Sequence, residues 1–330
     1  MLLKRKTFVN FGLSVLMVVM LAVAIPRLTA AQSDTSTTGN GLRITPIRQE
    51  MVLAPGQVDS YKIEVTNVSP GDINVVTVIN DFASDNETGQ PRLLTAEEGE
   101  SPYSLTKFVV LPDDFLLRPG EKKEVEIKVE VPVNIAPGGY FGIVRFASGG
   151  NQDEQGNIAL NASVGSILLV TVPGQVEEGM ELGFIQARTG GVSRSLFEYT
   201  PDTLAINLIN TGNSILKPFG RVAIKDMFGN EVMAFEFNGG KFRGNVLPKS
   251  SRTFEQELDD FGTIGRYTVE ANISYGKGGG NIINAVYTFW IVPWRLIIGI
   301  LAGILLVVWF ATRGVKIYNR RIIEKAKKEI

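Results

Sequence analysis

The sequence predicts an all-β protein: two tandem β-sandwich domains followed by a single C-terminal transmembrane α-helix. Short segments with alternating apolar and polar residues recur between residues 42 and 292, as expected for half-buried strands. Pro-Gly turns separate these segments at the spacing of sandwich strands. A long uncharged run stands near the C-terminus, where it can cross a membrane.

Residues 1–31 have the form of a signal peptide. A basic cluster (KRK) precedes a long apolar run, and small residues (TAA) permit cleavage before Gln32. Because the apolar run is longer than is usual for a signal peptide, an uncleaved membrane anchor is the alternative. The polar segment 32–41 is predicted to be a flexible linker.

The clearest strand signals are two segments in which every second residue is apolar. In "KKEVEIKVEVP" and "RYTVEANISY" the residues expected to face a core are Val125, Ile127, Val129, Val131, Tyr267, Val269, Ala271, Ile273 and Tyr275. Further predicted strands are "SYKIEVTN", "INVVTVIND", "GGYFGIVRFAS", "SILLVTVP", "TLAINLIN", "FGRVAIKD" and "EVMAFEF". No long segment of helical period separates them, which disfavours parallel sheets with crossover helices.

The strand-rich region is too long for one seven-strand sandwich of roughly 100 residues. The strand pattern is interrupted at "VPGQVEEGM" (172–180), where proline, glycine and acidic residues cluster. We therefore predict an immunoglobulin-like β-sandwich over 42–173 and a second β-sandwich over 178–292.

The glycine-rich stretch 210–232 raises the question of a phosphate-binding loop. Such a loop must open a helix, so that backbone amides and the helix dipole meet the anion. Here the glycines join one predicted strand to the next. The stretch is therefore interpreted as part of a sandwich wall.

The C-terminal region predicts one membrane span. A transmembrane helix is expected over 294–312, in which the uncharged run 296–312 spans roughly 26 Å at about 1.5 Å per residue. Trp294 and Trp309 suit the two membrane interfaces, and the basic tail 313–330 indicates a cytoplasmic C-terminus.

Gly299 and Gly303 form a G-x-x-x-G pair within that span. The pair is able to bring two helices close together, although glycine is also common in membrane helices that do not associate.

Composition narrows the function. The chain has no His, which removes the commonest general base. It also has no Cys, which removes thiol nucleophiles, thiolate zinc sites and disulfides. Basic residues concentrate at the two ends, and the region between them is acidic, which disfavours nucleic-acid binding. We expect a non-enzymatic protein without cofactors, and we assign no catalytic, cofactor-binding or metal-binding residue.

One loop deserves comparison with a calcium site, because calcium prefers hard oxygen ligands. The segment "NDFASDNETG" gathers Asp81, Asp85, Asn86 and Glu87. Its spacing is not that of an EF-hand, and a solvated acidic loop is the favoured interpretation.

Three other groups of residues are candidate sites. Aromatic residues able to line a glycan platform or to fill a core are Phe108, Phe115, Tyr140, Phe141 and Phe146, and a core role is favoured. The adjacent carboxylates Glu97–Glu98, Asp113–Asp114 and Asp259–Asp260 point to opposite faces of an extended chain and give no shared site. The "PKSS" segment (248–251) lies at a turn, where a lysine is hydrated and does not activate a serine.

The order of these segments resembles that of the WxL-interacting proteins. The resemblance is carried mainly by "LRITPIRQEMVLAPGQ", "YKIEVTN", "NDF", "LRPGEKKEVEIKVEVP" and "APGGYFGIVRF" of the first domain. It implies a signal peptide, a peptidoglycan-binding immunoglobulin-like domain, a second host-binding sandwich, one transmembrane helix and a basic tail. No ligand-contact residue is transferred, because the matched motifs are strand and turn positions.

Together these features predict a bacterial cell-surface protein anchored by its C-terminal helix. Its expected partners are cell-wall peptidoglycan or a secreted surface protein, and membrane lipid around 294–312. The alternative is a membrane-tethered assembly factor or chaperone for a surface fibre, which would present an unpaired edge strand to its subunit. An enzyme accessory or hydrolase would require a concave acidic pocket. The sequence indicates no oligomeric state.

Overall fold

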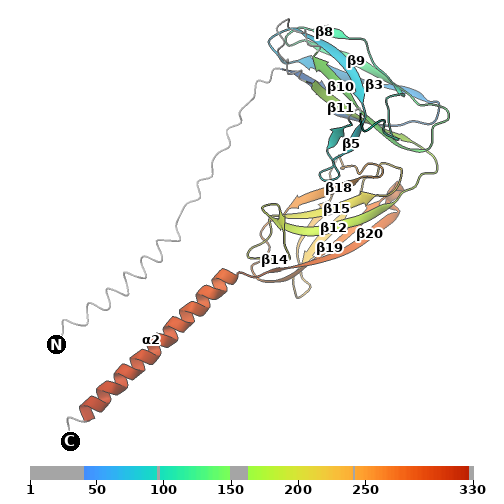
Figure 1. Cartoon of the computed structure of the whole chain (residues 1–330). Helices are drawn as coiled ribbons and strands as arrows, with labels where there is room; N and C mark the ends of the chain where they lie inside the picture. Colours follow the sequence, from blue (N-terminus) through green and yellow to red (C-terminus); the bar gives the residue numbers. More distant parts are fainter. Residues whose placement is uncertain (1–40, 95–96, 149–162, 241, 327–330) are drawn as a thin grey trace. The chain divides into compact units, whose positions relative to one another are not determined.

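The computed structural model describes residues 41–94, 97–148, 163–240 and 242–326. These residues form two β-sandwiches and one long helix (Figure 1). The predicted signal peptide, 1–31, lies outside the described residues, as does the predicted linker except for Gly41. The all-β prediction with one C-terminal helix is confirmed.

The first sandwich consists of two facing sheets and a small hairpin. Its strands are β1 (Leu42–Thr45), β2 (Arg48–Val52), β3 (Val58–Asn67), β4 (Ile73–Asn80), β5 (Phe82–Ser84), β6 (Pro91–Leu93), β7 (Val109–Val110), β8 (Phe115–Leu117), β9 (Lys122–Glu130), β10 (Gly138–Ser148) and β11 (Ser163–Val172). One sheet has the order β1-β3-β9-β7 and the other β2-β11-β10-β4-β8. Strands β5 and β6 pair only with each other.

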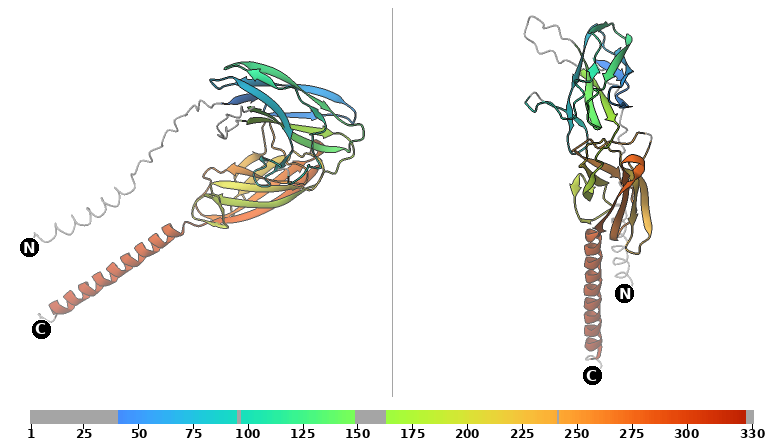
Figure 2. Two further views of the ribbon diagram at one scale, coloured as in Figure 1. Left: turned by 45° about the horizontal axis from the view of Figure 1, so that its top comes forward. Right: turned by 90° about the vertical axis from the view of Figure 1, so that its right-hand side faces the viewer.

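The second sandwich has the same construction. Its elements are β12 (Met180–Thr189), β13 (Val192–Ser193), β14 (Leu196–Phe197), β15 (Thr203–Asn210), β16 (Phe219–Lys225), β17 (Glu231–Phe237), β18 (Ser251–Glu257), β19 (Gly265–Tyr275), the 3₁₀ turn η1 (Lys277–Gly279) and β20 (Asn281–Ile291). One sheet has the order β13-β12-β15-β18 and the other β14-β20-β19-β16-β17. The turned views of Figure 2 show the two layers of this sandwich.

Each sandwich is held by one apolar core between its sheets, as the alternating patterns predict. Val125, Ile127 and Val129 of β9 face the first core and are 4%, 0% and 0% exposed. The predicted inward residues of β19 face the second core, with Tyr275 at its margin. β20 was not among the strands predicted from the sequence.

The two sandwiches repeat one strand order. The row β1-β3-β9 of the first corresponds to β12-β15-β18 of the second, and the opposite sheets correspond strand for strand. In both, a short strand pairs in parallel with the last strand of the domain, β2 with β11 and β14 with β20. This repeat is not evident in the strand patterns of the sequence.

The repeat extends to individual hydrogen bonds, because β3 and β15 each end in an asparagine with equivalent partners. Asn67 Nδ2 donates to the carbonyls of Gly71 and Leu117, at 2.7 and 3.0 Å. Asn210 Nδ2 donates to the carbonyls of Ser214 and Val246, also at 2.7 and 3.0 Å. In each sandwich one buried amide thus fixes two loops of otherwise different sequence.

The C-terminal helix α2 (Trp294–Ala326) begins three residues after β20 ends. Its portion Trp294–Ile317 has a mean hydropathy of 2.3 and is long enough to cross a bilayer. The helix therefore continues beyond 312, where the sequence analysis ended the span. A side chain at Gly299 or Gly303 would meet nothing within 4 Å, and helix pairing at this G-x-x-x-G stays a prediction.

Candidate partner-binding edge

A small apolar cluster joins the two sandwiches. Phe82, Phe141 and Leu169 of the first sandwich pack with Leu247 of the second, and all four are buried. The rings of Phe82 and Phe141 are centred 5.0 Å apart and tilted by 57°. Ile215, in the loop after β15, packs against the same cluster. The contact is formed by the chain's own side chains rather than by a linker alone.

The Pro-Gly-Gly turn before β10 belongs to this joint. The amide of Gly139 donates to the carbonyl of Asn213 at 2.9 Å, and Asn213 Oδ1 accepts from the amide of Glu177 at 2.9 Å. A Cβ on Gly139 would lie 2.5 Å from Ile215 Cγ1. The glycine is therefore required by close approach of the second sandwich. The stretch 210–232 does form strand, turn and strand, as predicted, and its first loop also contacts the first sandwich.

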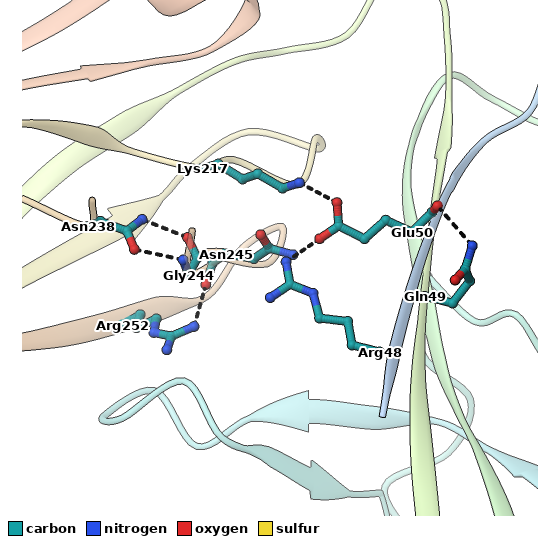
Figure 3. Close-up of polar contacts among 8 residues, drawn as sticks. All are labelled: Arg48, Gln49, Glu50, Lys217, Asn238, Gly244, Asn245 and Arg252. Carbon is teal, nitrogen blue, oxygen red and sulfur yellow. Dashed lines mark hydrogen bonds and ion pairs between the residues drawn. The ribbon is translucent and has the colours of Figure 1, made fainter. Parts of the chain in front are cut away.

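An ion pair lies beside the apolar cluster. Glu50 on β2 contacts both Arg48 of its own strand and Lys217 of the second sandwich (Figure 3). Burial acts to raise the pKa of Glu50, but the hydrogen bonds and charges of Lys217 and Arg48 together outweigh it, so this pKa lies below its usual range.

The hairpin of β5 and β6 contacts the edge strand β18. The amide of Thr253 donates to the carbonyl of Glu87 at 2.6 Å, and the amide of Ser251 donates to Asn86 Oδ1 at 3.2 Å. The Ser251 hydroxyl donates to the carbonyl of Asn86 at 2.7 Å, and the Ser84 hydroxyl donates to the carbonyl of Ser251 at 3.2 Å. The first sandwich thus supplies backbone partners to a sheet edge of the second.

Arg252 packs under this hairpin. Its guanidinium lies 5.1 Å from the centre of the Phe254 ring. It also donates to the carbonyl of Asn245 at 3.0 Å (Figure 3). Desolvation by burial lowers the pKa of Arg252. A Cβ on Gly89 would lie 2.5 Å from Arg252 Cδ, so the hairpin closes on this side chain.

The loop considered for calcium serves this docking. Asp85 Oδ1 accepts from the amides of Glu87 and Gly89, at 3.0 and 2.7 Å, and the Thr88 hydroxyl donates to Asp85 Oδ2. These hydrogen bonds outweigh a desolvation that acts to raise the pKa of Asp85, and hold it below its usual range. Asp81 accepts from the amide of Ser101 at 3.1 Å. Within the described residues, His, Cys, Asp and Glu form no group of three able to hold a metal ion.

The other sequence candidates do not assemble into a site. The five aromatic residues considered for a glycan platform are all buried. Phe108, Phe115, Tyr140 and Phe146 lie in the first core, as favoured, and Phe141 lies in the cluster between the sandwiches. Glu98 pairs with Arg92 at 2.8 Å, and Asp260 accepts from the Thr200 hydroxyl at 2.7 Å, so these carboxylates have separate partners. Lys249 donates to the carbonyl of Thr211, while the Ser250 hydroxyl donates to that of Leu247 at 2.9 Å.

The sandwiches differ in how their sheet edges are covered. In the first, β2 covers the edge of β11 with residues 48–52 against 167–171. In the second, β14 covers only the end of β20, with 196–197 against 290–291. Among the described residues, no strand pairs with this side of β20 over 281–289.

The open edge of β20 presents unpaired backbone groups. The amide of Trp290 donates to the carbonyl of Ser195 at 2.8 Å, which places the N–H and C=O groups of even-numbered residues on the side away from β19. The corresponding groups of Ile282, Asn284 and Val286 therefore face the open edge. They have the spacing that an added strand requires.

The composition of β20 offers no protection against strand pairing. The strand, "NIINAVYTFWI", contains no charge, no proline and no glycine, whereas edge strands are usually guarded by such residues. Ile282 and Val286 are 62% and 70% exposed on its outer face. Its inward residues Ile283, Ala285 and Tyr287 are only partly buried.

The equivalent strand of the first sandwich shows what covering achieves. Strand β11 has β2 paired along its edge. Its inward-facing residues are 0% exposed: Leu168, Val170 and Val172. The partial burial of the inward residues of β20 coincides with the lack of a paired neighbouring strand over 281–289 among the described residues.

A groove on the opposite side of the second sandwich is a weaker candidate. Its volume is 530 Å³, and it lies between β17 and β18, floored by Ile206, Phe235 and Phe254. Its lining includes the charged residues Glu236 and Arg252, and the amides of Ser251 and Thr253 on β18 are already bonded to the hairpin.

Comparison with known proteins adds the following findings. No family model matches the chain, and no curated protein matches it. Among solved structures, the chain is similar to the class 5 fimbriae chaperone CfaA, at 13% identity over 77% of this chain and 100% of that one, with a TM-score of 0.38. It is similar to the E. coli chaperone DraB, at 14% identity over 76% and 98%, with a TM-score of 0.32. It is also similar to the Pseudomonas aeruginosa CupB2 chaperone, at 12% identity over 74% and 98%, with a TM-score of 0.32.

Proposed function

We propose that this chain is a membrane-tethered assembly factor that holds an extended segment of another surface or secreted protein along the open edge of β20. The observation that carries the proposal is the uncovered, uncharged edge of β20 over 281–289. A strand added there satisfies backbone groups of the edge and completes the cover over the half-buried inward residues. The function is binding, not catalysis.

The chain itself indicates the kind of occupant. Where the first sandwich has β2, the second has only the two residues of β14. An occupant continuing the line of β14 would run parallel to β20, and it would need few charges over about five to seven residues. The occupant should be apolar on both faces. One face would lie beside Ile282 and Val286 on the outer side of the sheet, and the other beside Ile283 and Tyr287 on the core side.

A second copy of the chain does not fit this edge. Two β20 edges related by the usual two-fold axis would pair antiparallel. Because α2 begins three residues after β20, the two helices would then leave in opposite directions and could not enter one membrane from the same side. The proposal therefore commits to a different protein as partner.

The location follows from the C-terminal helix. The portion Trp294–Ile317 is long and apolar enough to cross a membrane. The basic residues that follow favour a cytoplasmic C-terminus, so we propose that both sandwiches lie outside. The resemblance to the WxL-interacting proteins adds the expectation that the first sandwich binds peptidoglycan. The aromatic residues considered for that role are buried, so no described side chain supports wall binding in particular.

Co-purification with paired variants tests the proposal. The full chain carrying Val286→Lys places a charge on the open edge, and Ala234→Lys places one on β17, the exposed edge strand at the other end of the same sheet. After gentle solubilisation of native membranes, the partner should be depleted at least roughly tenfold with Val286→Lys and retained with Ala234→Lys. Unchanged far-UV circular dichroism confirms that both variants are folded.

Two results would count against the proposal. Identical partners for both variants would remove the β20 edge from the binding site. Sedimentation of the full chain with isolated cell-wall sacculi, equal for both variants and without any protein partner, would favour the peptidoglycan-binding alternative.

A further inference from the structure

Several loops gather at the end of the second sandwich from which α2 leaves. Gly265 pairs with Ile291, the last residue of β20, and a Cβ on Gly265 would lie 2.6 Å from Met227 Cε. Glu198 pairs with Arg295 of α2 at 3.4 Å. We call this the helix end of the sandwich, defined by 198–202, 226–230, 258–265 and the start of α2. Figure 1 shows β14 and β20 running to it.

The hairpin between β16 and β17 holds an aromatic residue outward at this end. Asp226 accepts from the amides of Phe228 and Asn230, both at 2.9 Å, and from Asn230 Nδ2 at 3.0 Å. These hydrogen bonds fix a tight turn whose tip is Met227 and Phe228. Phe228 is 82% exposed, an unusual position for a large apolar side chain on a rigid turn.

Other exposed apolar residues share the helix end. They are Tyr199, Ile264 and Trp294. Tyr199 also lines a cavity of 390 Å³ together with Pro293 and Leu296, so the apolar surface is continuous with the start of α2.

Four of the five carboxylates at this end have named partners, and the fifth, Asp259, is exposed. Asp202 Oδ2 accepts from the amide of Gly190 at 2.8 Å, Asp260 accepts from the Thr200 hydroxyl, and Glu198 pairs with Arg295. Asp226 is used by the turn. The exposed features of this end therefore include the apolar side chains and Asp259.

We propose that the helix end of the second sandwich is seated in the membrane interface, with Met227, Phe228 and Ile264 inserted among lipid headgroups and upper acyl chains. The inference rests on the membrane span proposed for α2 and goes beyond the partner-binding function. The helix delivers this end to the bilayer, because its apolar portion starts only three residues after β20. Burial of a few apolar side chains about 5–10 Å deep is the ordinary mode of interfacial attachment.

The charges predict which lipid is needed. Near the described apolar tip residues, Lys225 pairs with Glu270 and Arg295 with Glu198. Hydrogen bonds from Asn230 and from the amide of Phe228 hold the pKa of Asp226 below its usual range. Insertion should therefore depend on apolar contact and should not require anionic lipid. Fixing the sandwich in this way would hold the β20 edge at a constant height above the membrane.

Spin-label depth measurement tests the seat. The chain has no cysteine, so one introduced cysteine is labelled uniquely. The full chain is reconstituted in phosphatidylcholine vesicles with Ile264→Cys at the helix end, Lys277→Cys at the opposite end of β19 and β20, or Leu305→Cys in the helix. Relative accessibility to oxygen and to a water-soluble nickel complex reports depth for each label.

We expect the label at 305 deep in the bilayer, the label at 264 at the interface and the label at 277 in water. Adding Phe228→Ser to Ile264→Cys should move the label at 264 several-fold towards water-like accessibility, and adding anionic lipid should change nothing. A label at 264 as water-exposed as that at 277, with 305 deep, would overturn the interfacial seat while leaving the span intact. A water-exposed label at 305 would overturn the span, and the seat with it.

Discussion

At the joint between the sandwiches, single residues decide how closely the two domains approach. Gly139 has no room for a side chain, because a Cβ would lie 2.5 Å from Ile215 Cγ1 and 2.9 Å from the Ile215 amide nitrogen. In the sequence this glycine looks like an ordinary turn residue after Pro137. The reason for it lies some 75 residues further along the chain, in a loop that no local pattern connects with it.

Gly139→Ala should loosen this joint. The added methyl forces the 213–215 loop away, at a cost of about 1–3 kcal/mol, typical of overpacking. The expected results are a lower unfolding temperature and faster amide exchange at Asn213 and Ile215. Gly71→Ala is the matched control, because a Cβ at Gly71 meets nothing within 4 Å. Equal behaviour of the two variants would contradict a packed joint.

Lys249 occupies a position where the repeat predicts glycine. Gly120 and Lys249 follow a proline in the equivalent loops of the two sandwiches, with φ of +74° and +54°. A left-handed backbone conformation destabilises a folded chain by roughly 1–2 kcal/mol when the residue is lysine. Glycine adopts this conformation without that strain, but it gives the unfolded chain more conformational entropy, which cancels part of the gain. Lys249→Gly should therefore stabilise the second sandwich by about 0.5 kcal/mol in urea unfolding. Marked destabilisation would mean that the contact of Lys249 with the Thr211 carbonyl dominates.

The joint should also weaken in acid. The folded-state pKa of Glu50 lies below its ordinary value of 4.5. Its contribution is therefore fully present well above pH 4.5 and is lost as pH falls through the lowered folded pKa. Amide protection factors at the joint, which are corrected for the intrinsic pH dependence of exchange, should fall below about pH 4.5. Glu50→Gln should flatten this part of the pH dependence, and an unchanged profile in that variant would exclude Glu50 as its source.

At the scale of elements, most strands are predictable from the sequence, but the strands beside which they pair are not. The alternation in β9 and β19 reports a buried face directly, so these strands were predicted correctly. β5 and β6 have three residues each, too few for a period, and their docking strand β18 is distant in sequence. β20 was missed because it is apolar on both faces and runs on towards the apolar helix. That lack of alternation is itself the signal that could have drawn attention to it.

Amide exchange along β20 should show the open edge. The amides of odd-numbered residues such as Ile283 and Ala285 bond to β19 and should exchange slowly. Those of Ile282, Asn284 and Val286 face the edge and should exchange much faster in the partner-free chain. In β11 no such alternation is expected over 167–171, where β2 pairs with it. Uniform protection along β20 would mean that its edge is already occupied.

At the scale of the whole molecule, the chain covers one edge internally and leaves another open. The hairpin of the first sandwich supplies backbone partners to β18, in the place that β7 takes beside β9. The edge of β20 has no comparable cover among the described residues. Sequence composition predicted a membrane-anchored, non-catalytic binding protein, but the binding edge depends on which strands meet, and only the three-dimensional arrangement contains that information.

Site-specific photo-crosslinking in living cells tests the partner-binding edge most directly. A photo-reactive amino acid is placed at Asn284 on β20 or, as control, at Ala234 on β17, both exposed positions of the same sheet. We expect a discrete crosslinked protein from 284 and none from 234, with the crosslink mapping to an extended, uncharged segment of the partner. No crosslink from 284, or the same products from both positions, would contradict it.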